Sequence, residues 1–326
     1  INPAGRGFHT HSGFVFSFGE KSGIMDRKLS ADREGNGMKI RELLDGGRVT
    51  LSFEVFPPKA DADFEPIREA VGAISALRPD FMSVTYGASG GTSKNTVRIA
   101  SYLQNGCGTT ALAHLSCVSS TRQEVAGMLG ELKANHIENI LALRGDIPEQ
   151  GAFPLPGNYQ YAYQLIEDIR KTAPDVCIGA ACYPEGHVEC GSKEQDILYL
   201  KQKVESGCQF LTTQMFFDNN ILYNFMFRLL KAGVDVPVVA GIMPVTNSKQ
   251  ITRICSLSGT ALPPRFRAIV DKFSDNPAAM RQAGIAYATE QMIDLIANGV
   301  KNVHIYTMNK PDVAGSIMQN LSEMIG

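Results

Sequence analysis

The stretch Ser52–Pro58 (SFEVFPP) predicts a buried strand that ends at two prolines and carries one carboxylate near its end. Side chains alternate along a strand, so Phe53 and Val55 face one side while Glu54 faces the other. Proline cannot donate to a sheet ladder, so Pro57 ends the strand. A glutamate inside an apolar strand is costly unless it is paired or has a function. Glu54 is therefore the first candidate functional residue.

From about residue 50 onward, short β-branched or aromatic runs alternate with amphipathic helical stretches. The predicted strands are Thr50–Phe56, Phe81–Tyr86, Thr110–Cys117, Asn139–Arg144, Cys177–Tyr183, Phe210–Phe216, Pro237–Met243 and Asn302–Met308. The predicted helices lie near 63–77, 92–105, 121–135, 159–172, 192–206, 219–232, 247–257, 277–298 and 312–324. Eight strand-then-helix units predict an α/β fold, a single-domain (β/α)8 TIM barrel. A doubly wound open sheet is the alternative, which the lack of G-x-G-x-x-G after a strand weakens.

Composition limits the classes of partner. The chain has 326 residues, of which 44% are hydrophobic and 20% charged, and a formal net charge of −2. This charge gives no support for binding nucleic acid or an anionic membrane surface, and no apolar run reaches the roughly 20 residues of a membrane span. The seven cysteines form no C-x-x-C pair, which favours reduced thiols in a cytoplasmic protein over a disulfide framework or a zinc site.

The first 37 residues differ from the rest. They are rich in Gly, Ser and charge, and no basic segment precedes a long apolar core as in a signal peptide. Met38 resembles a natural start. We therefore expect residues 1–37 to be a poorly ordered N-terminal extension and residues 38–326 to be the catalytic domain.

In a (β/α)8 barrel the active site lies at the carboxyl ends of the strands. Polar, ionisable and aromatic side chains stand at or just after the predicted ends: Glu54, Thr85, Tyr86, His114, Arg144, Asp146, Tyr183, Glu185, His187, Gln214, Phe216, Phe217, Asp218, Asn247, Gln250, Tyr306, Asn309 and Lys310. This combination suits a large ligand that is partly aromatic and partly anionic. No S-x-x-K, G-x-S-x-G or P-loop motif supports serine-hydrolase or P-loop nucleotide chemistry.

Each of these residues also has a purely structural explanation. Glu54 could pair with Arg144 or with a loop amide. A lone histidine such as His114 on an apolar strand is more often a satisfied core residue than a catalyst, and no metal-ligand spacing supports it. Asp196 and Lys203 lie seven residues apart on one face of a predicted helix and are most simply solvated. Arg144–Asp146 could be only a polar turn, and Gln214 could only cap a neighbouring loop. Phe216 and Phe217 could be ordinary core aromatic residues. The joint placement at one end of a barrel is what favours a site.

A family resemblance rests on eight stretches that follow one another along the chain. They are Ser52–Pro58 (SFEVFPP), Ser83–Ala88 (SVTYGA), Ala113–Cys117 (AHLSC), Ala142–Asp146 (ALRGD), Tyr183–His187 (YPEGH), Thr213–Asp218 (TQMFFD), Gly241–Asn247 (GIMPVTN) and Tyr306–Asn309 (YTMN). Together they resemble bacterial-type methylenetetrahydrofolate reductase over roughly residues 48–310. The resemblance implies a (β/α)8 flavoprotein that carries FAD and reduces 5,10-methylenetetrahydrofolate to 5-methyltetrahydrofolate with NAD(P)H, in one-carbon metabolism and methionine biosynthesis.

The resemblance also implies residue roles. Glu54 is the implied general acid, which protonates the departing folate nitrogen, and Asp146 is the implied carboxylate that tunes the flavin and meets the pterin. The residues implied to line FAD are Thr85, Tyr86, Ala88, His114, Arg144, Gly145, Asp146, Tyr161, Tyr183, His187, Asp196 and Lys203. The residues implied to contact folate or nicotinamide are Gln214, Gln250, Tyr306 and Lys310. Arg144 and Lys203 are the expected charge partners of the FAD pyrophosphate.

The implied chemistry places a requirement on Glu54. A hydride acceptor forms on the folate only if the ring nitrogen is protonated, so we expect a desolvated Glu54 with a raised pKa. One pocket that serves nicotinamide and folate in turn implies ping-pong turnover. We expect no metal ion in the site, and we expect the chain to form a homo-oligomer.

Three other functions remain open. The barrel could be a folate-reducing subunit that receives electrons from a partner protein, since Ile254 and Met215 stand where aromatic residues are common. It could also reduce a different flavin substrate, or be a non-enzymatic pterin-binding subunit. The presence of Glu54, Asp146 and Gln214 together speaks against the last of these.

Overall fold

A computed structural model describes residues 38–86, 93–118, 120–147, 153–154 and 157–325, and the predicted N-terminal extension lies outside them. Eight parallel strands close into a barrel in chain order, with β8 hydrogen-bonded to β1. They are β1 (Thr50–Val55), β2 (Phe81–Val84), β3 (Ala111–Ser116), β4 (Asn139–Leu143), β5 (Cys177–Cys182), β6 (Phe210–Thr213), β7 (Val238–Ile242) and β8 (Asn302–Tyr306). The predicted (β/α)8 barrel is confirmed, and the strands are shorter than predicted at their carboxyl ends.

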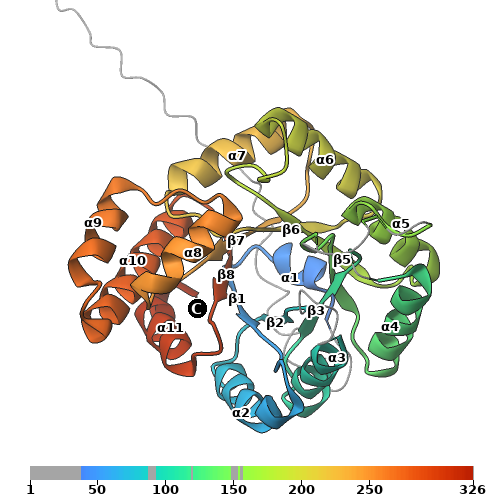
Figure 1. The fold of residues 1–326 in the computed structure, drawn as a ribbon, viewed down its shortest axis with the longest axis horizontal. Helices are drawn as coiled ribbons and strands as arrows, with labels where there is room; N and C mark the ends of the chain where they lie inside the picture. Colours follow the sequence, from blue (N-terminus) through green and yellow to red (C-terminus); the bar gives the residue numbers. More distant parts are fainter. Residues whose placement is uncertain (1–37, 87–92, 119, 148–152, 155–156, 326) are drawn as a thin grey trace, which may run out of the picture. The chain divides into compact units, whose positions relative to one another are not determined.

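Helices surround the barrel (Figure 1). They are α2 (Phe64–Ser75), α3 (Ser93–Ser101), α4 (Arg122–Ala134), α5 (Ala162–Thr172), α6 (Lys193–Glu205), α7 (Asn219–Lys231), α8 (Ser248–Ser258), α9 (Pro264–Phe273), α10 (Pro277–Ala297) and α11 (Pro311–Ile325). The predicted capping box of Thr121 and Glu124 is present at the start of α4, and Asn247 caps α8 as expected. Among the helices that the structure describes, none combines the length and apolar character that crossing a membrane requires.

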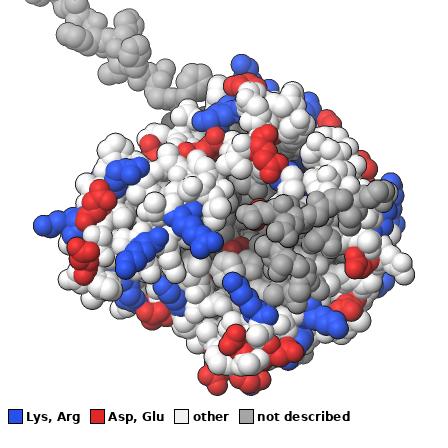
Figure 2. All heavy atoms as spheres, in the orientation of Figure 1, with Lys and Arg blue, Asp and Glu red and all other residues white. Residues whose placement is uncertain are grey.

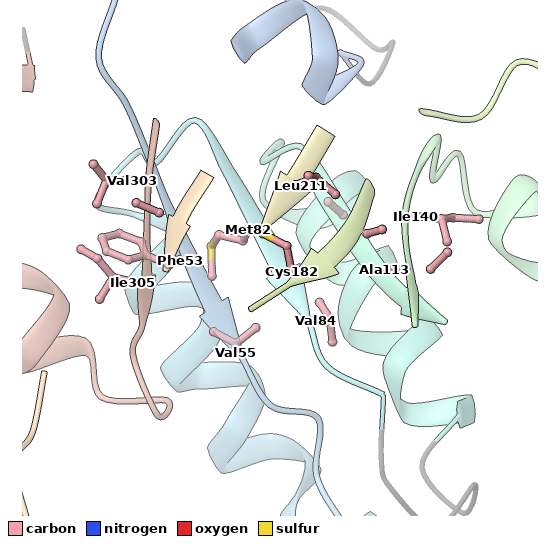
Figure 3. Close-up of a cluster of buried hydrophobic side chains, with 14 of the residues drawn as sticks. Phe53, Val55, Met82, Val84, Ala113, Ile140, Cys182, Leu211, Val303 and Ile305 are labelled. Carbon is pink, nitrogen blue, oxygen red and sulfur yellow. The ribbon is translucent and has the colours of Figure 1, made fainter. Parts of the chain in front are cut away.

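The strands present one face to the helices and the other to the barrel interior. On β1, Phe53 and Val55 are fully buried and pack in one cluster with Val71 and Ile74 of α2. Figure 3 shows side chains of this outer layer, among them the labelled residues Phe53, Val55, Met82, Val84, Ala113, Ile140, Cys182, Leu211, Val303 and Ile305. Burial of this layer contributes about 25 cal/mol per Å² of apolar surface. Alternation then turns Glu54 toward the interior.

A short helix that the sequence did not predict, α1 (Ile40–Leu44), closes the amino-terminal end of the interior. Ile40 and Leu44 are buried in one cluster with inward residues from the start of the strands, namely Phe81, Leu112, Leu141, Cys177, Phe210 and Val239. Asn139 accepts the backbone N–H of Ile40 at 2.8 Å and donates to the carbonyl of Met38 at 3.2 Å. Five residues are too few to show a helical period, so the pattern could not reveal α1.

Helix α9 is the second element that the sequence did not predict. It begins at Pro264 directly after Pro263, a pair more typical of a loop, although proline is also favoured in the first helical turn. Phe266 of α9 is buried with Met215 and Phe217, which follow β6, in a separate hydrophobic cluster. This cluster supports the loops that leave β6 and β7.

Candidate active site

Glu54 lies buried inside the barrel between two histidines. Its Oε2 is 3.5 Å from Nε2 of His114 on β3 and 3.7 Å from Nε2 of His304 on β8. Ser83, the register partner of Glu54 on β2, donates its hydroxyl to the same oxygen at 3.3 Å. The alternative in which Glu54 pairs with Arg144 is wrong, because the partners of this carboxylate come from β8, β2 and β3.

The expectation of a raised pKa for Glu54 is wrong for the free protein. Burial raises the pKa, but the interactions with His304, His114 and Ser83 outweigh burial and leave the pKa of Glu54 below its ordinary value. Burial lowers the pKa of His114 to about 4, although the charge of Glu54 opposes this. At neutral pH, Glu54 is therefore a carboxylate and His114 is neutral. The sequence indicated the burial of Glu54 but gave no sign that a histidine of β8 lies beside it.

The loop after β8 fixes the end of β1. Thr307 donates its hydroxyl to the carbonyl of Glu54 at 2.6 Å. The amide of Asn309 accepts the N–H of Phe56 at 2.8 Å and donates to the carbonyl of Phe56 at 2.9 Å. These bonds hold the backbone that carries Glu54 against β8 beyond the last rung of the strand ladder. They also explain why β1 ends before Phe56.

Gly145 lies where the chain leaves β4, with a φ of +86°. A Cβ at this position would overlap the hydroxyl oxygen of Ser116 on β3. Ser116 donates that hydroxyl to the carbonyl of Arg144 at 3.0 Å, and Val118 donates its N–H to the same carbonyl at 2.8 Å. Only glycine satisfies both the backbone angle and the close approach.

Arg144 forms a bidentate ion pair with Glu189, which lies in the segment after β5. The two N–O distances are 2.6 and 2.7 Å. The hydrogen-bonded pairing raises the pKa of Arg144 and lowers that of Glu189. Arg144 thus offers an oriented guanidinium at the exits of β4 and β5, where an anionic ligand group could bind.

Two rings stand at the exit of β5. Tyr183 and His187 meet edge to face, with ring centroids 4.6 Å apart. Burial, assisted by the charge of Asp146, raises the pKa of Tyr183 to about 12, and burial lowers the pKa of His187. Both rings are therefore uncharged at neutral pH and suit an aromatic ligand.

Asp196 and Lys203 of α6 face the barrel rather than solvent, so the solvated alternative is wrong for both. Asp196 is 6% exposed, and its carboxylate accepts the backbone N–H of His187 at 3.3 Å. Lys203 donates its ammonium group to the carbonyl of Ala181 on β5 at 2.9 Å. Burial raises the pKa of Asp196 and lowers that of Lys203, as expected for charges held away from water.

Other predicted cofactor residues lie further out. Thr85 and Tyr86 follow β2 directly and are partly exposed. Tyr161 is the N-cap residue of α5 and is 45% exposed, with its ring stacked on Tyr199 at a centroid distance of 6.4 Å. Ala88 lies outside the described residues.

Tyr306 ends β8 beside Glu54, its register partner, and reaches across the interior. Its hydroxyl donates to the carbonyl of Thr213 on β6. Gly241 of β7 makes this possible, because a Cβ there would overlap the Tyr306 hydroxyl and the Thr213 carbonyl. Burial raises the pKa of Tyr306 well above its ordinary value, so the hydroxyl stays protonated. Gln214 follows β6 at once, and its side-chain oxygen accepts the next backbone N–H at 3.0 Å.

The remaining predicted residues belong to the rim. Lys310 donates its ammonium group to the hydroxyl of Thr246 at 2.7 Å, which links the loops after β8 and β7. Gln250 on the first turn of α8 and Asp146 after β4 are exposed. The structure therefore groups Glu54 and His114 in the interior with Tyr306, the flavin candidates mainly at the exits of β4 and β5, and Lys310 and Gln250 beside the exits of β7 and β8.

These residues fit a ligand with aromatic rings and anionic groups. Arg144 and Lys203 supply positive charge, and Tyr183 and His187 supply uncharged rings. Nε2 of His114 is buried with no hydrogen-bond partner among the described residues, as expected of an atom that awaits a ligand. Figure 2 shows a hollow on one face of the molecule with positive and negative side chains interspersed around it. Among the described residues, no three His, Cys, Asp or Glu side chains are placed to hold a metal ion.

Sequence reasoning did not single out His304, Ser83, Ser52 or Glu189. Strand alternation could have placed the first three inside the barrel, since His304 shares a face with Tyr306 and Ser83 faces inward on β2, but it could not have placed them beside Glu54. Glu189 carried no such signal, because it lies in an irregular segment where no period predicts its direction.

Comparison with known proteins gives the same family by two routes. The sequence profile described as methylenetetrahydrofolate reductase matches residues 39–322. A relative from Zea mays, "Methylenetetrahydrofolate reductase (NADH) 1", is 35% identical over 295 residues, which cover 87% of this chain and 50% of the relative. The 5,10-methylenetetrahydrofolate reductase of Escherichia coli (strain K12) is 33% identical over 275 residues, which cover 84% of this chain and 91% of the relative. The chain thus spans about half the length of the plant relative and nearly all of the bacterial one.

A solved structure supports the fold. It is described as an uncharacterized protein from Clostridium thermocellum that binds two copies of 5-methyl-5,6,7,8-tetrahydrofolic acid, and it aligns with a TM-score of 0.59 over 88% of this chain and 99% of its own. The sequence identity is 14%, so this likeness concerns the barrel alone.

Proposed function

The chain belongs to the methylenetetrahydrofolate reductase family, and we propose that it reduces 5,10-methylenetetrahydrofolate to 5-methyltetrahydrofolate with NAD(P)H. The observation that carries this proposal is the buried Glu54 flanked by His114 and His304, because opening the folate ring needs a positioned acid. The plant relative is named for NADH, which supports NADH as the donor. The Clostridium protein binds a methylated folate on the same kind of barrel, which supports a folate as the substrate.

We propose that FAD is the cofactor, and that residues 38–326 are the catalytic domain. Bound FAD would supply a carrier that takes a hydride from the nicotinamide and passes it to the folate. Arg144 and Lys203 would hold its anionic groups, while Tyr183 and His187 would lie against its uncharged parts. The other proposed cofactor residues are Thr85, Tyr86, Ala88, His114, Gly145, Asp146, Tyr161 and Asp196.

Glu54 is the proposed general acid. Its carboxyl would give a proton to the folate nitrogen that departs when the five-membered ring opens. Thr307 and Asn309 would keep its backbone in place during this step. A pterin that enters the interior would exclude water and raise the affinity of the carboxyl for a proton.

Four residues are proposed to orient the substrates. Tyr306 lies beside Glu54 in the register of β8 and β1 and offers a hydroxyl, and Gln214, directly after β6, offers an amide. Lys310 and Gln250 lie at the rim, where the ammonium group of Lys310 suits the carboxylates of a folate tail. Because nicotinamide and folate would use this interior in turn, turnover is proposed to be ping-pong.

Anaerobic stopped-flow spectroscopy of the FAD-loaded protein tests the proposal. NADH or NADPH should bleach the flavin, and 5,10-methylenetetrahydrofolate should restore its absorbance. A reduced flavin that the folate does not reoxidise would refute the function. A flavin that folate reoxidises, but that only dithionite and neither nicotinamide can reduce, would favour the alternative of a folate-reducing subunit supplied by a partner protein.

A second arm of this experiment isolates Glu54. Glu54→Gln should still let the nicotinamide bleach the flavin, because hydride transfer to the flavin needs no acid at this position. It should slow reoxidation by folate by about 10²-fold or more. Loss of both half-reactions would show that Glu54 does not have the separate role proposed.

We also propose that the protein is a cytoplasmic homo-oligomer. Sedimentation of the purified chain measures the number of subunits in the assembly.

A further inference from the structure

Glu185 lies just after β5 and has no part in the proposed function so far. We propose that it is a positioning residue, which holds residues 183–189, the β5 exit segment, at a fixed spacing from helix α8. The β5 exit segment carries Tyr183 and His187, the proposed flavin partners, and α8 carries Gln250, a proposed substrate partner. The consequence for catalysis rests on the proposed function, whereas the link itself can be measured without turnover.

The carboxyl group of Glu185 binds the loop between α8 and α9. Both of its oxygens accept the backbone N–H of Ala261, each at 3.1 Å, although the two residues are 76 positions apart in the chain. Burial raises the pKa of Glu185, while the N–H of Ala261 and the charge of Lys193 oppose this rise. The carboxyl group is therefore drawn partly out of water and held against the loop.

A second contact joins the same two parts of the chain. Gly259 ends α8 with a φ of 68°, and a Cβ at this position would lie 2.6 Å from Cγ1 of Val188 in the β5 exit segment. The side chain of Val188 therefore reaches the end of α8. Together with the bond from Ala261 to Glu185, this contact restrains the direction of the segment as well as its distance from α8.

The other restraints on the β5 exit segment come from different elements. Arg228 of α7 donates to the carbonyl of Pro184 at 3.0 Å, and Asp196 of α6 accepts the N–H of His187 at 3.3 Å. The ion pair described above leads only to the exit of β4. Among the hydrogen bonds that the structure describes for this segment, those of Glu185 are the ones that reach the chain beyond α8.

The loop that Glu185 binds also contacts the proposed substrate side of the barrel. Thr260 is 6% exposed, and its hydroxyl donates to the carbonyl of Met215 at 3.3 Å. Met215 directly follows Gln214, a second proposed substrate partner, and Ala261 directly follows Thr260. The loop thus lies between the proposed flavin partners on one side and the proposed substrate partners on the other.

This link would prepare the free protein for its ligands. A segment that is already ordered loses less conformational entropy when a ligand binds, so the affinity is higher. The spacing of two reactants also limits the rate of transfer between them. Without Glu185, the rings of Tyr183 and His187 would depend more on the bound flavin for their order, and their spacing from α8 would vary.

Hydrogen exchange of the full chain, with and without FAD, tests the link. In the wild-type protein, FAD should slow exchange in the β5 exit segment and also in residues 254–261, because Glu185 joins the two. In Glu185→Ala, FAD should still slow exchange in the exit segment but not in residues 254–261. Glu185→Gln should restore the wild-type pattern, because its amide oxygen accepts the same N–H. Equal protection of residues 254–261 in Glu185→Ala and wild type would overturn the proposal, as would no protection there in wild type.

Affinity for FAD gives a second readout. Glu185→Ala should bind FAD about three- to tenfold more weakly than wild type, as expected for the loss of one hydrogen bond, and Glu185→Gln should recover most of this loss. Ala261→Pro, which removes the N–H from the other partner, should weaken binding to a similar extent and tests the bond even if Glu185→Ala does not fold. The control is Glu194→Ala, because Glu194 is an exposed acid on the first turn of α6. Wild-type affinity in a folded Glu185→Ala or Ala261→Pro protein would contradict the role of the bond.

The half-reactions separate this proposal from the proposed function. With the protein saturated by FAD, Glu185→Ala should slow reoxidation of the flavin by folate about three- to tenfold, and Glu185→Gln should restore the rate. An unchanged rate in Glu185→Ala would refute the consequence for catalysis. A wild-type chain that binds FAD but reduces no folate would refute the proposed function alone, because the exchange pattern still decides whether Glu185 links the two parts of the chain.

Discussion

Asn309 hydrogen-bonds both backbone groups of Phe56, although 253 residues separate the two. Its amide takes the place of the next rung between β1 and β8, whose last register pair is Glu54 and Tyr306. Asn309 itself has a φ of 55°, a left-handed backbone that asparagine adopts more readily than most residues. The side chain of Asn309 thus joins the residue that follows β1 to the segment that follows β8.

Asn309→Ala should lower the free energy of unfolding by about 1–3 kcal/mol, since Phe56 loses both partners. Asn309→Gly removes the same bonds but relaxes the left-handed backbone, so comparing the two variants separates the hydrogen bonds from the strain. Urea denaturation measures both. Stability equal to wild type in Asn309→Gly would contradict a role for these bonds.

Gly145→Ala should destabilise the protein more than Gly108→Ala. Both positions have a positive φ, of 86° and 66°, so both variants are strained by roughly 1–2 kcal/mol. Only at Gly145 would the new Cβ overlap Ser116, whereas nothing lies within 4 Å of a Cβ at Gly108. Thermal unfolding of the two variants and their affinity for FAD are the measurements. The same loss in both would show that the close approach to β3 does not matter.

Glu189→Gln should bind FAD about two- to fivefold more tightly than wild type, because the carboxylate no longer competes for Arg144 and the Glu189 side chain is about half exposed. Riboflavin, which lacks the pyrophosphate, should bind equally to both. The control is Glu290→Gln, which breaks a similar bidentate pair with Arg265 on α9 and α10. Quenching of flavin fluorescence on titration of the apoprotein measures the affinities. Weaker binding of FAD would mean that Glu189 positions Arg144 instead of competing for it.

Stability should rise with pH between about 4 and 6.5 because of His114. Burial lowers its pKa from 6.5 in the unfolded chain to about 4 in the folded protein, so the unfolded state binds more protons in this window. Between pH 5 and pH 7.5 the gain should be on the order of 2 kcal/mol. His114→Gln should flatten this dependence, as followed by urea denaturation at each pH. An equally steep profile in the variant would exclude His114 as its source.

The parts of this protein that could be predicted from the sequence are those that depend on local period. Strand alternation in Ser52–Pro58 placed Glu54 inside the barrel, and the repeat of strands and helices gave the (β/α)8 class. The capping box at Thr121 was equally visible, because its partners lie three residues apart.

The parts that could not be predicted depend on partners far apart in the chain. The charge of Glu54 is set by His304, 250 residues away along the sequence, and the guanidinium of Arg144 is oriented by Glu189 from the next βα segment. The bonds of Asn309 to Phe56 and the helix α1 left no periodic pattern. The expected pKa of Glu54 was wrong for this reason, since burial could be inferred from the strand but the neighbouring imidazoles could not.

Helix α1 limits the route by which ligands enter and leave the barrel interior. Ile40 and Leu44 fill the interior at the amino-terminal ends of the strands. Within the described part of the chain, a molecule that approaches Glu54 must therefore enter and leave past the carboxyl ends of the strands. Under the proposed ping-pong turnover, entry of the second substrate would wait for exit of the first product. A compound lodged at this opening would block both halves of the cycle, and the rate at which spent nicotinamide leaves would set a ceiling on turnover.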